Sequence, residues 1–359
     1  MIDMIEAPLP KNATELGHQV KNGEFFENKI FTGFTFHKTD ISGGIFTNIK
    51  FDGCSFLECN LKDAIFNQCQ FIECSFSNMN CENVNFIGCQ LSACVFDLME
   101  LDKYHFIDSD LSGNEFFKSE FLGSVFQQCN LKSASLNEVN LKEAVLNECN
   151  LEEVTFKQCA FYKTTINICL FGHNSFSQCE FAMVFITKAN LAKVDFSGMS
   201  LVQSQFQDCD LTGCNFSSSI LNQSSFSGSK ITQCNFNNSN LGLVNFYEAD
   251  LTEVLMEACN LVQASMQKSV ISKCLLSGSN LEMTQLTDAK ISESILKGCN
   301  FNYSDLSHSV LYDSDFSDSN MSMAKLHESF EDKCVWTRVN KSSAQGTNEQ
   351  LKKAETWVK

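Results

Sequence analysis

The side chains that could do chemistry in this chain are spread along it without the spacing that chemistry needs. Six histidines could act as bases or metal ligands, but they are scattered, and no pair of them has metal-ligand spacing. Ser177, Ser197 and Ser217 recur at a fixed interval with no histidine beside them. Gly43 and Gly44 form an isolated pair and not a phosphate-binding loop. We therefore expect no catalytic, cofactor-binding or metal-binding residue and no enzymatic activity.

Nineteen cysteines are the other reactive group, and their positions indicate packing. Eighteen of them, such as Cys54, Cys129 and Cys299, stand two residues before a large apolar residue, and Cys81 takes an apolar position itself. Other chain positions of this kind hold Ala, Ser or Val. A free cysteine behaves as a small buried hydrophobe. So many free thiols favour a reducing compartment.

A strict repeat of five residues underlies these positions. Every fifth residue from Phe26 to Leu326 is Phe, Leu, Ile or Met, with Cys81 the single exception, and the register never shifts. A period of five is neither that of a helix nor that of a plain strand. It indicates a chain that turns a corner every five residues and points one large and one small side chain inward each time.

Segments such as ECNLKDAIF and DCDLTGCNF resemble the pentapeptide-repeat family, whose motif is A(D/N)LXX. This resemblance implies an all-β fold, a right-handed quadrilateral β-helix with four pentapeptides per coil and about 15 coils. We expect three parts: an N-terminal cap segment over 1–25, the β-helix over 26–326, and a C-terminal cap, linker and short helix over 327–359.

The C-terminal part carries its own candidates. Trp336 fits the register once more and is expected to plug the last coil. Thr347 and Gln350 resemble a capping box that opens a helix over about 349–357. Trp336, Leu351 and Trp357 are the candidates for capping or docking, and a homodimer through this segment is one expected use. There is no signal peptide and no apolar run long enough for a membrane span, so we expect a cytoplasmic protein.

Charge bounds the class of partner. The net charge is −17, and Arg338 is the only arginine. Twelve acids and four lysines lie between Asp97 and Glu153, so this short belt is strongly acidic. Nucleic-acid binding needs clusters of Lys and Arg, so direct nucleic-acid binding is not expected. An acidic protein more naturally binds a protein partner with a basic surface.

The acidic belt is also the most irregular part of the repeat. Its small inward positions hold Met99, Tyr104 and Asn114, which we expect to push a corner outward or loosen the coil. Apolar residues follow on the outside, including Phe185. An exposed apolar patch can mark an interface. The partner-binding candidates are therefore Asp97, Glu100, Asp102, Tyr104, Asp108, Asp110, Val125, Val145, Glu148, Ile168 and Phe185.

The leading hypothesis for function is a non-enzymatic scaffold for protein–protein interaction, bacterial in origin, in which an acidic β-helix binds a macromolecular partner. The family resemblance implies one alternative, a DNA-mimicking protein that binds gyrase or topoisomerase IV and protects it from quinolones. Against it, no face of the expected β-helix forms an acidic stripe. Another alternative is an accessory or effector-associated protein of a bacterial secretion system. The identity of the partner and the oligomeric state stay open.

Overall fold

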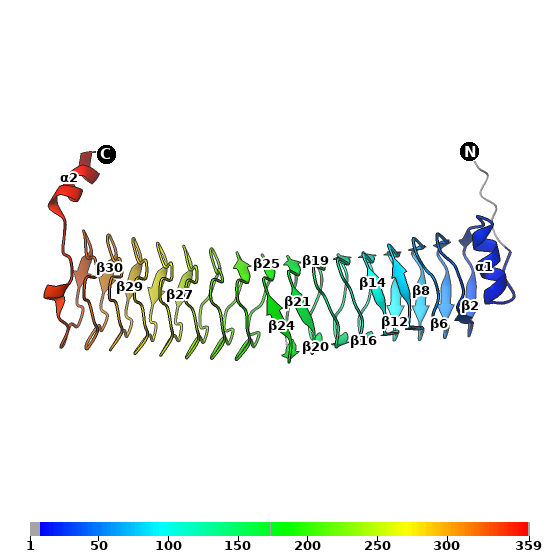
Figure 1. Ribbon diagram of the computed structural model, residues 1–359, viewed down its shortest axis with the longest axis horizontal. Helices are drawn as coiled ribbons and strands as arrows, with labels where there is room; N and C mark the ends of the chain where they lie inside the picture. Colours follow the sequence, from blue (N-terminus) through cyan, green and yellow to red (C-terminus); the bar gives the residue numbers. More distant parts are fainter. Residues whose placement is uncertain (1–7, 173, 358–359) are drawn as a thin grey trace. The chain divides into compact units, whose positions relative to one another are not determined.

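A computed structural model describes residues 8–172 and 174–357, apart from the side chains of residues 80, 81, 101, 102 and 175. The chain forms two compact units, Met1–Glu180 and Phe181–Lys359. Both are built from parallel β-structure wound into a solenoid, and together they contain about 15 turns (Figure 1). The expectation of an all-β solenoid with a short C-terminal helix is confirmed.

The five-residue repeat sets the size of one turn. Phe46 pairs with Phe66 in a parallel ladder, and Phe66 pairs with Phe86, so each residue aligns with the residue 20 positions later. One turn therefore takes four repeats, one on each side. Because every turn lies one strand spacing from the next, about 4.8 Å, identical positions form columns along the solenoid.

Short strands of the first unit line the four sides. One side holds β1 (Phe26–Glu27), β4 (Ile45–Thr47), β7 (Ile65–Asn67), β11 (Asn85–Ile87), β15 (His105–Ile107), β17 (Val125–Gln127), β19 (Val145–Asn147) and β22 (Thr165–Asn167). The next holds β2 (Ile30–Thr32), β5 (Lys50–Asp52), β8 (Gln70–Ile72) and β12 (Gln90–Ser92). The third holds β3 (Thr35–His37), β6 (Ser55–Leu57), β9 (Ser75–Ser77), β13 (Val95–Asp97), β16 (Glu115–Phe117), β18 (Ser135–Asn137), β20 (Thr155–Lys157) and β23 (Ser175–Ser177). The fourth holds β10 (Asn80–Glu82), β14 (Glu100–Asp102) and β21 (Ala160–Tyr162).

The second unit has fewer strands because many of its turns pair through single bridges. Its strands are β25 (Phe185–Thr187), β26 (Gln205–Gln207), β27 (Asp250–Thr252), β28 (Val270–Ser272), β29 (Lys290–Ser292), β30 (Val310–Tyr312) and β31 (Phe330–Asp332), and β24 (Glu180–Ala182) spans the unit boundary. Bridges such as Asn240 to Asn260 and Asn260 to Asn280 keep the interval of 20 residues. A 3-10 turn, η1 (Lys341–Ser343), and the helix α2 (Glu349–Trp357) follow.

Large rings fill the interior in columns. Phe206 is fully buried and stacks on Phe226, with 5.0 Å between ring centroids and 5° between planes. Phe216 meets Phe206 edge-on at 5.9 Å. Offset stacks along a column and edge-to-face contacts across it are the arrangements that aromatic quadrupoles favour. The buried rings thus account for the strict five-residue spacing.

The side chains at the small inward positions also form hydrogen bonds with the backbone of neighbouring turns. The hydroxyl of Ser229 donates to the carbonyl of Phe206 at 2.6 Å and accepts from the amide of Cys209 at 3.0 Å. The thiol of Cys209 points in the same way at the carbonyl of Ile186, at 3.5 Å. Buried backbone groups need such partners. Ser and Cys can therefore both fill these positions. The expectation that the cysteines are buried free thiols holds for 16 of the 18 described, with Cys179 and Cys334 partly exposed.

The corners of the turns adopt the left-handed backbone conformation. Gly, Asn and Asp occupy many of them, such as Gly113 (φ 66°), Asn48 (φ 51°) and Asp108 (φ 49°). These are the residues that enter this region at least cost. Ile168 also adopts it, with φ 54°, and among the described residues it is the only β-branched side chain to do so.

An N-terminal helix that the repeat pattern did not predict packs on the first turns. This helix, α1 (Ala13–Lys21), begins where the Asn12 side chain accepts the amide of Glu15. It buries Leu16 and Val20 and, as Figure 1 shows, lies against the first strands. Covering this end keeps the first strands from pairing with another chain.

The large inward residues of the acidic belt do not disturb the fold as expected. Met99, Tyr104 and Asn114 are each 1 % exposed or less. Backbone hydrogen bonds continue through them, for example from Glu120 to Met99 at 2.7 Å. The oxygen of the Asn114 side chain accepts the amide of Cys94 at 2.9 Å. The expected loosening of the coil was wrong because these side chains are accommodated in the interior.

Candidate functional site

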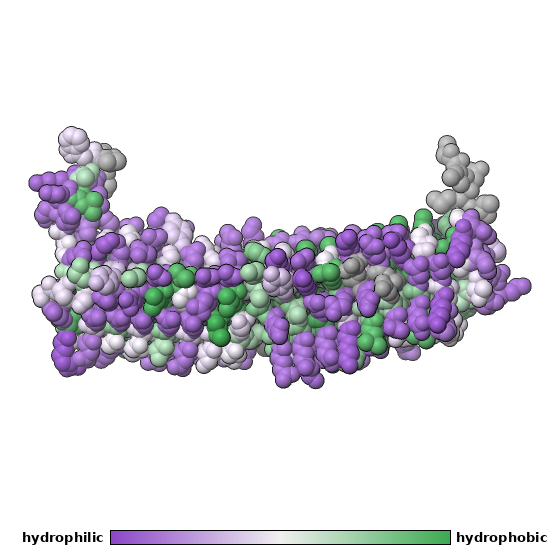
Figure 2. Space-filling model, viewed as in Figure 1, coloured by the Kyte–Doolittle hydropathy of each residue, from purple (hydrophilic) through white to green (hydrophobic). Residues whose placement is uncertain are grey.

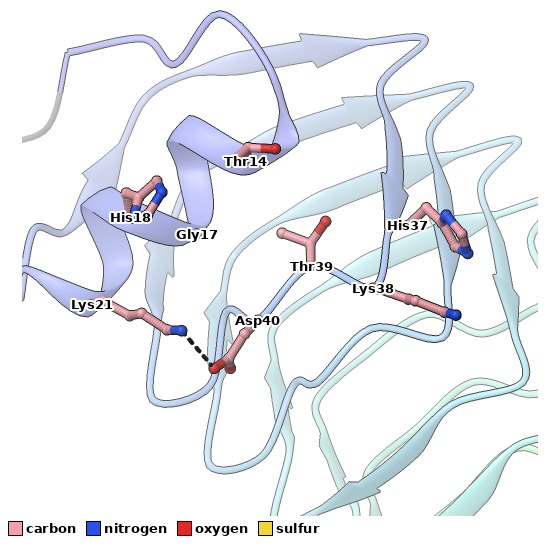
Figure 3. Close-up of a pocket in the computed structure, with 8 residues that line it drawn as sticks. All are labelled: Thr14, Gly17, His18, Lys21, His37, Lys38, Thr39 and Asp40. Carbon is pink, nitrogen blue, oxygen red and sulfur yellow. Dashed lines mark ion pairs between the residues drawn. The ribbon is translucent and has the colours of Figure 1, made fainter.

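A pocket of about 190 Å³ lies between α1 and the segment that follows β3 (Figure 3). Basic side chains gather there, but they are paired. Lys21 of α1 reaches the carboxylate of Asp40 at 3.2 Å, and Lys38 reaches Glu58 at 3.4 Å. The hydroxyl and amide of Ser42, together with Lys21, hold the pKa of Asp40 below its usual value. The Lys21–Asp40 pair attaches the helix to the solenoid, and both lysines already have a carboxylate partner, so we do not choose this pocket as the binding site.

A better candidate is the outer surface of β15, β17, β19 and β22 in the first unit, which we call the valine face. Val125 and Val145 are paired neighbours on it, half-buried, with His105 before them and Thr165 after them. Because these strands are in register, the side chains stand about 4.8 Å apart in one column. The face thus presents a short apolar strip between polar neighbours.

Amide side chains form the second column of the valine face. The amide of Asn167 donates to Asn147 at 2.6 Å, and that of Asn147 donates to Gln127 at 2.9 Å. Each amide thus orients the next. Ordered side chains lose little conformational entropy when a partner arrives.

The corner column beside the valine face combines acid and apolar groups. It contains Asp108, Gln128, Glu148 and Ile168, all exposed. Gln128 donates to Glu148 at 3.0 Å. Ile168 is 50 % exposed although its backbone conformation suits Gly or Asn better.

In the view of Figure 2 exposed apolar side chains form small separate patches among hydrophilic residues.

The structure brings together only part of the expected partner-binding set. The residues that meet at the valine face and its corner column are Asp108, Val125, Val145, Glu148 and Ile168. Asp110 lies on the adjoining side, where it accepts from Asn130 at 3.0 Å. Asp97 and Glu100 lie on strands of the two other sides.

Three further members of that set stand apart for different reasons. Tyr104 is 1 % exposed, so it cannot contact a partner directly, and that part of the expectation was wrong. The side chain of Asp102 lies outside the described residues. Phe185 is 45 % exposed but belongs to the second unit.

A cluster that the sequence did not reveal lies at the C-terminal end of the second unit. The imidazoles of His308 and His327 each reach the carboxylate of Glu355 in α2, at 3.2 Å. The two rings stand at 81° with centroids 5.2 Å apart. Partial desolvation opposes ionisation of Glu355, but hydrogen bonds from the two imidazoles outweigh it and lower the pKa of this carboxyl.

The signal for this cluster is weak in the sequence. His308 and His327 are 19 residues apart, one residue less than a full turn. His308 therefore occupies a corner, and His327 stands just before the equivalent corner of the following turn. Glu355 arrives from the tail, beyond the repeats. The sequence could have predicted that these three residues meet only if both the turn length and the path of the tail were known.

The three candidates for capping or docking have different environments. Trp336 stacks on Phe316 with centroids 4.4 Å apart, and Lys341 lies over its ring at 4.1 Å. It extends the interior column but stays half-buried. Leu351 and Trp357 on α2 are 45 % and 92 % exposed. A capping role fits the contacts of Trp336 better than those of the other two.

Family models match most of the repeat region. A pentapeptide repeat region matches residues 149–226 and 199–274, pentapeptide repeats of nine copies match 46–95, and pentapeptide repeats of eight copies match 124–161 and 294–329. The chain is a pentapeptide repeat protein. In the part of the chain that the structure describes, no helix is long and apolar enough to cross a membrane.

Solved structures of other pentapeptide repeat proteins are similar at low identity. HetL, involved in heterocyst differentiation regulation in the cyanobacterium Nostoc, is 17 % identical with TM-score 0.27, and the match covers 63 % of this chain and 89 % of HetL. QnrB1, a plasmid-mediated fluoroquinolone resistance protein, is 19 % identical with TM-score 0.25, covering 64 % of this chain and 91 % of QnrB1. A protein of the Arabidopsis thaliana thylakoid lumen is 28 % identical with TM-score 0.22, covering 28 % of this chain and 66 % of its own. No match was found among curated proteins.

Proposed function

We propose that this pentapeptide repeat protein is a non-enzymatic scaffold that binds a protein with a basic surface through the valine face and its corner column. The observation that carries this proposal is Ile168. A β-branched residue in the left-handed region is strained, and at a half-exposed corner it gains little burial in return. A strained, exposed apolar side chain is retained most readily where it contacts a partner.

Charge and apolar surface have separate parts in this proposal. Asp108 and Glu148 share the corner column with Ile168 and are exposed, so they attract a basic surface from a distance. Val125 and Val145 supply surface that loses water on contact. Charged rims mainly set the association rate, whereas desolvated apolar contacts mainly set the dissociation rate.

The experiment compares two pairs of charge reversals in the intact protein. Each variant is immobilised and exposed to cell extract, and the bound proteins are measured quantitatively. A captured protein is then purified, and its binding kinetics are measured with each variant. Asp108→Lys with Glu148→Lys changes the corner column. Glu138→Lys with Glu153→Lys changes the same number of charges at other exposed left-handed corners. Lysine is native at several such corners, including Lys118, so both variants should fold.

The first pair is expected to slow association by roughly tenfold at low salt and to flatten its salt dependence. The matched pair should leave the rate within about twofold. Val145→Asp should shorten the lifetime of the complex instead. Equal effects of the two pairs would show general attraction to an acidic protein and would overturn the assignment of this surface.

A further inference from the structure

The helix α2 is attached to the second unit by polar contacts. No residue within it is buried. Lys352 reaches Glu328 at 3.0 Å, and the amide of Asn348, just before the helix, donates to Nδ1 of His327 at 3.1 Å. Glu355, which lies between His308 and His327, adds a further link. Because no residue of the helix is buried, its attachment depends strongly on polar links of this kind.

The three side chains form a ligand set. Nε2 of His308 lies 3.2 Å from Oε1 of Glu355, and Nε2 of His327 lies 3.2 Å from Oε2. One donor atom from each residue falls within 4.8 Å of the others. The His327 side chain is 6 % exposed, whereas those of His308 and Glu355 are 35 % and 39 % exposed. The set is thus anchored on one buried imidazole and open to solvent on the other side.

We propose that His308, His327 and Glu355 bind one divalent transition-metal ion, Zn²⁺ being the ion to test, and that this ion fastens α2 to the solenoid. Two imidazole nitrogens and one carboxylate oxygen are a ligand set that zinc accepts in proteins. Three protein ligands leave a fourth position for water or for a group from a partner. The half-exposed side of His308 places that position toward solvent.

The distances require only modest closure. Zinc–nitrogen bonds of about 2.0–2.1 Å put tetrahedral ligand atoms about 3.3–3.4 Å apart, close to both nitrogen–oxygen separations here. The widest pair must approach by up to about 1.4 Å to reach that spacing. Glu355 stands on a helix with no buried side chain, and His308 is on a partly exposed corner, so neither side chain is held by a packed core.

Ion binding also moves one proton. Because the amide of Asn348 donates to Nδ1 of His327, the proton of this neutral imidazole is on Nε2 and points at Glu355. An ion takes the place of that proton, which moves to Nδ1. The hydrogen bond from Nε2 to Glu355 and the hydrogen bond from the backbone amide of Asn348 to Nδ1 are both given up for the metal–nitrogen bond, and no net proton is released from the ring.

The charges that face the cluster are consistent with a cation there. Glu355 and the nearby Glu328 are acidic, and Lys352 is paired with Glu328 at 3.0 Å. The contrasting account is a clasp held by hydrogen bonds alone. That account predicts that α2 is equally secure with and without added metal, so the two can be separated.

The test titrates Zn²⁺ alone into the reduced full-length protein by calorimetry and repeats the titration with Co²⁺ by absorption. His308→Ala and Glu355→Gln remove one ligand each without touching buried His327. The control is His37→Ala, which also stands beside a carboxylate, Glu58, at 3.7 Å. Limited proteolysis of the 340–348 segment with and without Zn²⁺ gives a second readout.

One ion per chain with a Kd of about 1 μM or below is expected, as three ligands hold zinc less tightly than four. His308→Ala and Glu355→Gln should weaken binding by about 100-fold or more and remove protection from proteolysis, whereas His37→Ala should match the unchanged protein. No saturable binding, equal binding in the ligand variants, or a sulfur-to-cobalt charge-transfer band from thiolate ligands would each overturn the site. None of these results depends on the valine face, so the two proposals fail separately.

Discussion

Replacing Ser229 by Ala should test why the small inward positions hold Ser and Cys. The change keeps the position small but removes one hydrogen-bond donor and one acceptor. The carbonyl of Phe206 loses a partner at 2.6 Å, and the amide of Cys209 loses one at 3.0 Å. Both atoms belong to buried residues, because Phe206 is fully buried and Cys209 is 2 % exposed.

The magnitude follows from two unsatisfied groups. A buried backbone group without a partner costs about 1–3 kcal/mol, so the two groups together should lower the free energy of unfolding of Ser229→Ala by about 2–6 kcal/mol. Ser229→Cys keeps a weaker donor and acceptor, so it should cost about 1 kcal/mol. Ser197→Ala, at an exposed position, should stay within about 0.5 kcal/mol.

Urea unfolding followed by circular dichroism measures the three free energies. Amide hydrogen exchange at Cys209 localises the effect, because each turn of a solenoid depends mainly on its neighbours. If Ser229→Ala is as stable as Ser229→Cys, the hydroxyl contributes only volume and the hydrogen-bond account is wrong.

Three further predictions concern other parts of the chain. Ile168→Asn should raise the free energy of unfolding by up to about 1 kcal/mol in thermal unfolding, because Asn tolerates the left-handed conformation, whereas a loss of stability would show that Ile168 is not strained. Burial raises the pKa of Cys209 to about 11 and that of Cys299 to about 12. At pH 8, maleimide labelling followed by mass spectrometry should therefore find the partly exposed Cys179 and Cys334 labelled first, and Cys209 and Cys299 labelled only after unfolding. Early labelling of Cys299 would contradict this. Desolvation opposes ionisation of Asp305, but hydrogen bonds from Ser307 and Lys325 outweigh it and lower the pKa of this carboxyl. Ionised Asp305 therefore stabilises the fold above about pH 4, and this stabilisation is lost as pH falls through the pKa of the folded state. Asp305→Asn should therefore reduce the steepness of the fall in Tm below about pH 5, and an unchanged profile would refute this.

The solenoid was predictable because each turn repeats the same pattern of inward-facing residues. Phe206 and its equivalents fix the inward spacing, and a single residue of slippage would bury polar side chains in every later turn. The helix α1 was not predictable in this way, since its apolar residues Leu16 and Val20 fit no repeat. The expected distortion at Tyr104 failed because volume alone does not say whether a neighbouring column has room.

The candidate sites were predictable only where they follow the columns. Val125 and Val145 share a face because they are 20 residues apart, and Glu148 and Asp108 share a corner for the same reason. Asp97 and Glu100 are near in sequence but lie on other sides of the turn, so proximity along the chain misled. His308 and Glu355 meet because the tail folds back, and no period encodes that contact.

The constant interval of 20 residues has a genetic consequence. A duplication or loss of one complete turn of codons within the repeats restores every ladder above and below it, because each residue finds a partner of the same kind. Length can thus change by whole turns while the sides keep their order. A shift by any smaller number of pentapeptides rotates all later columns by one or more sides. Selection on such a gene is therefore expected to tolerate indels in multiples of a turn and to remove the others.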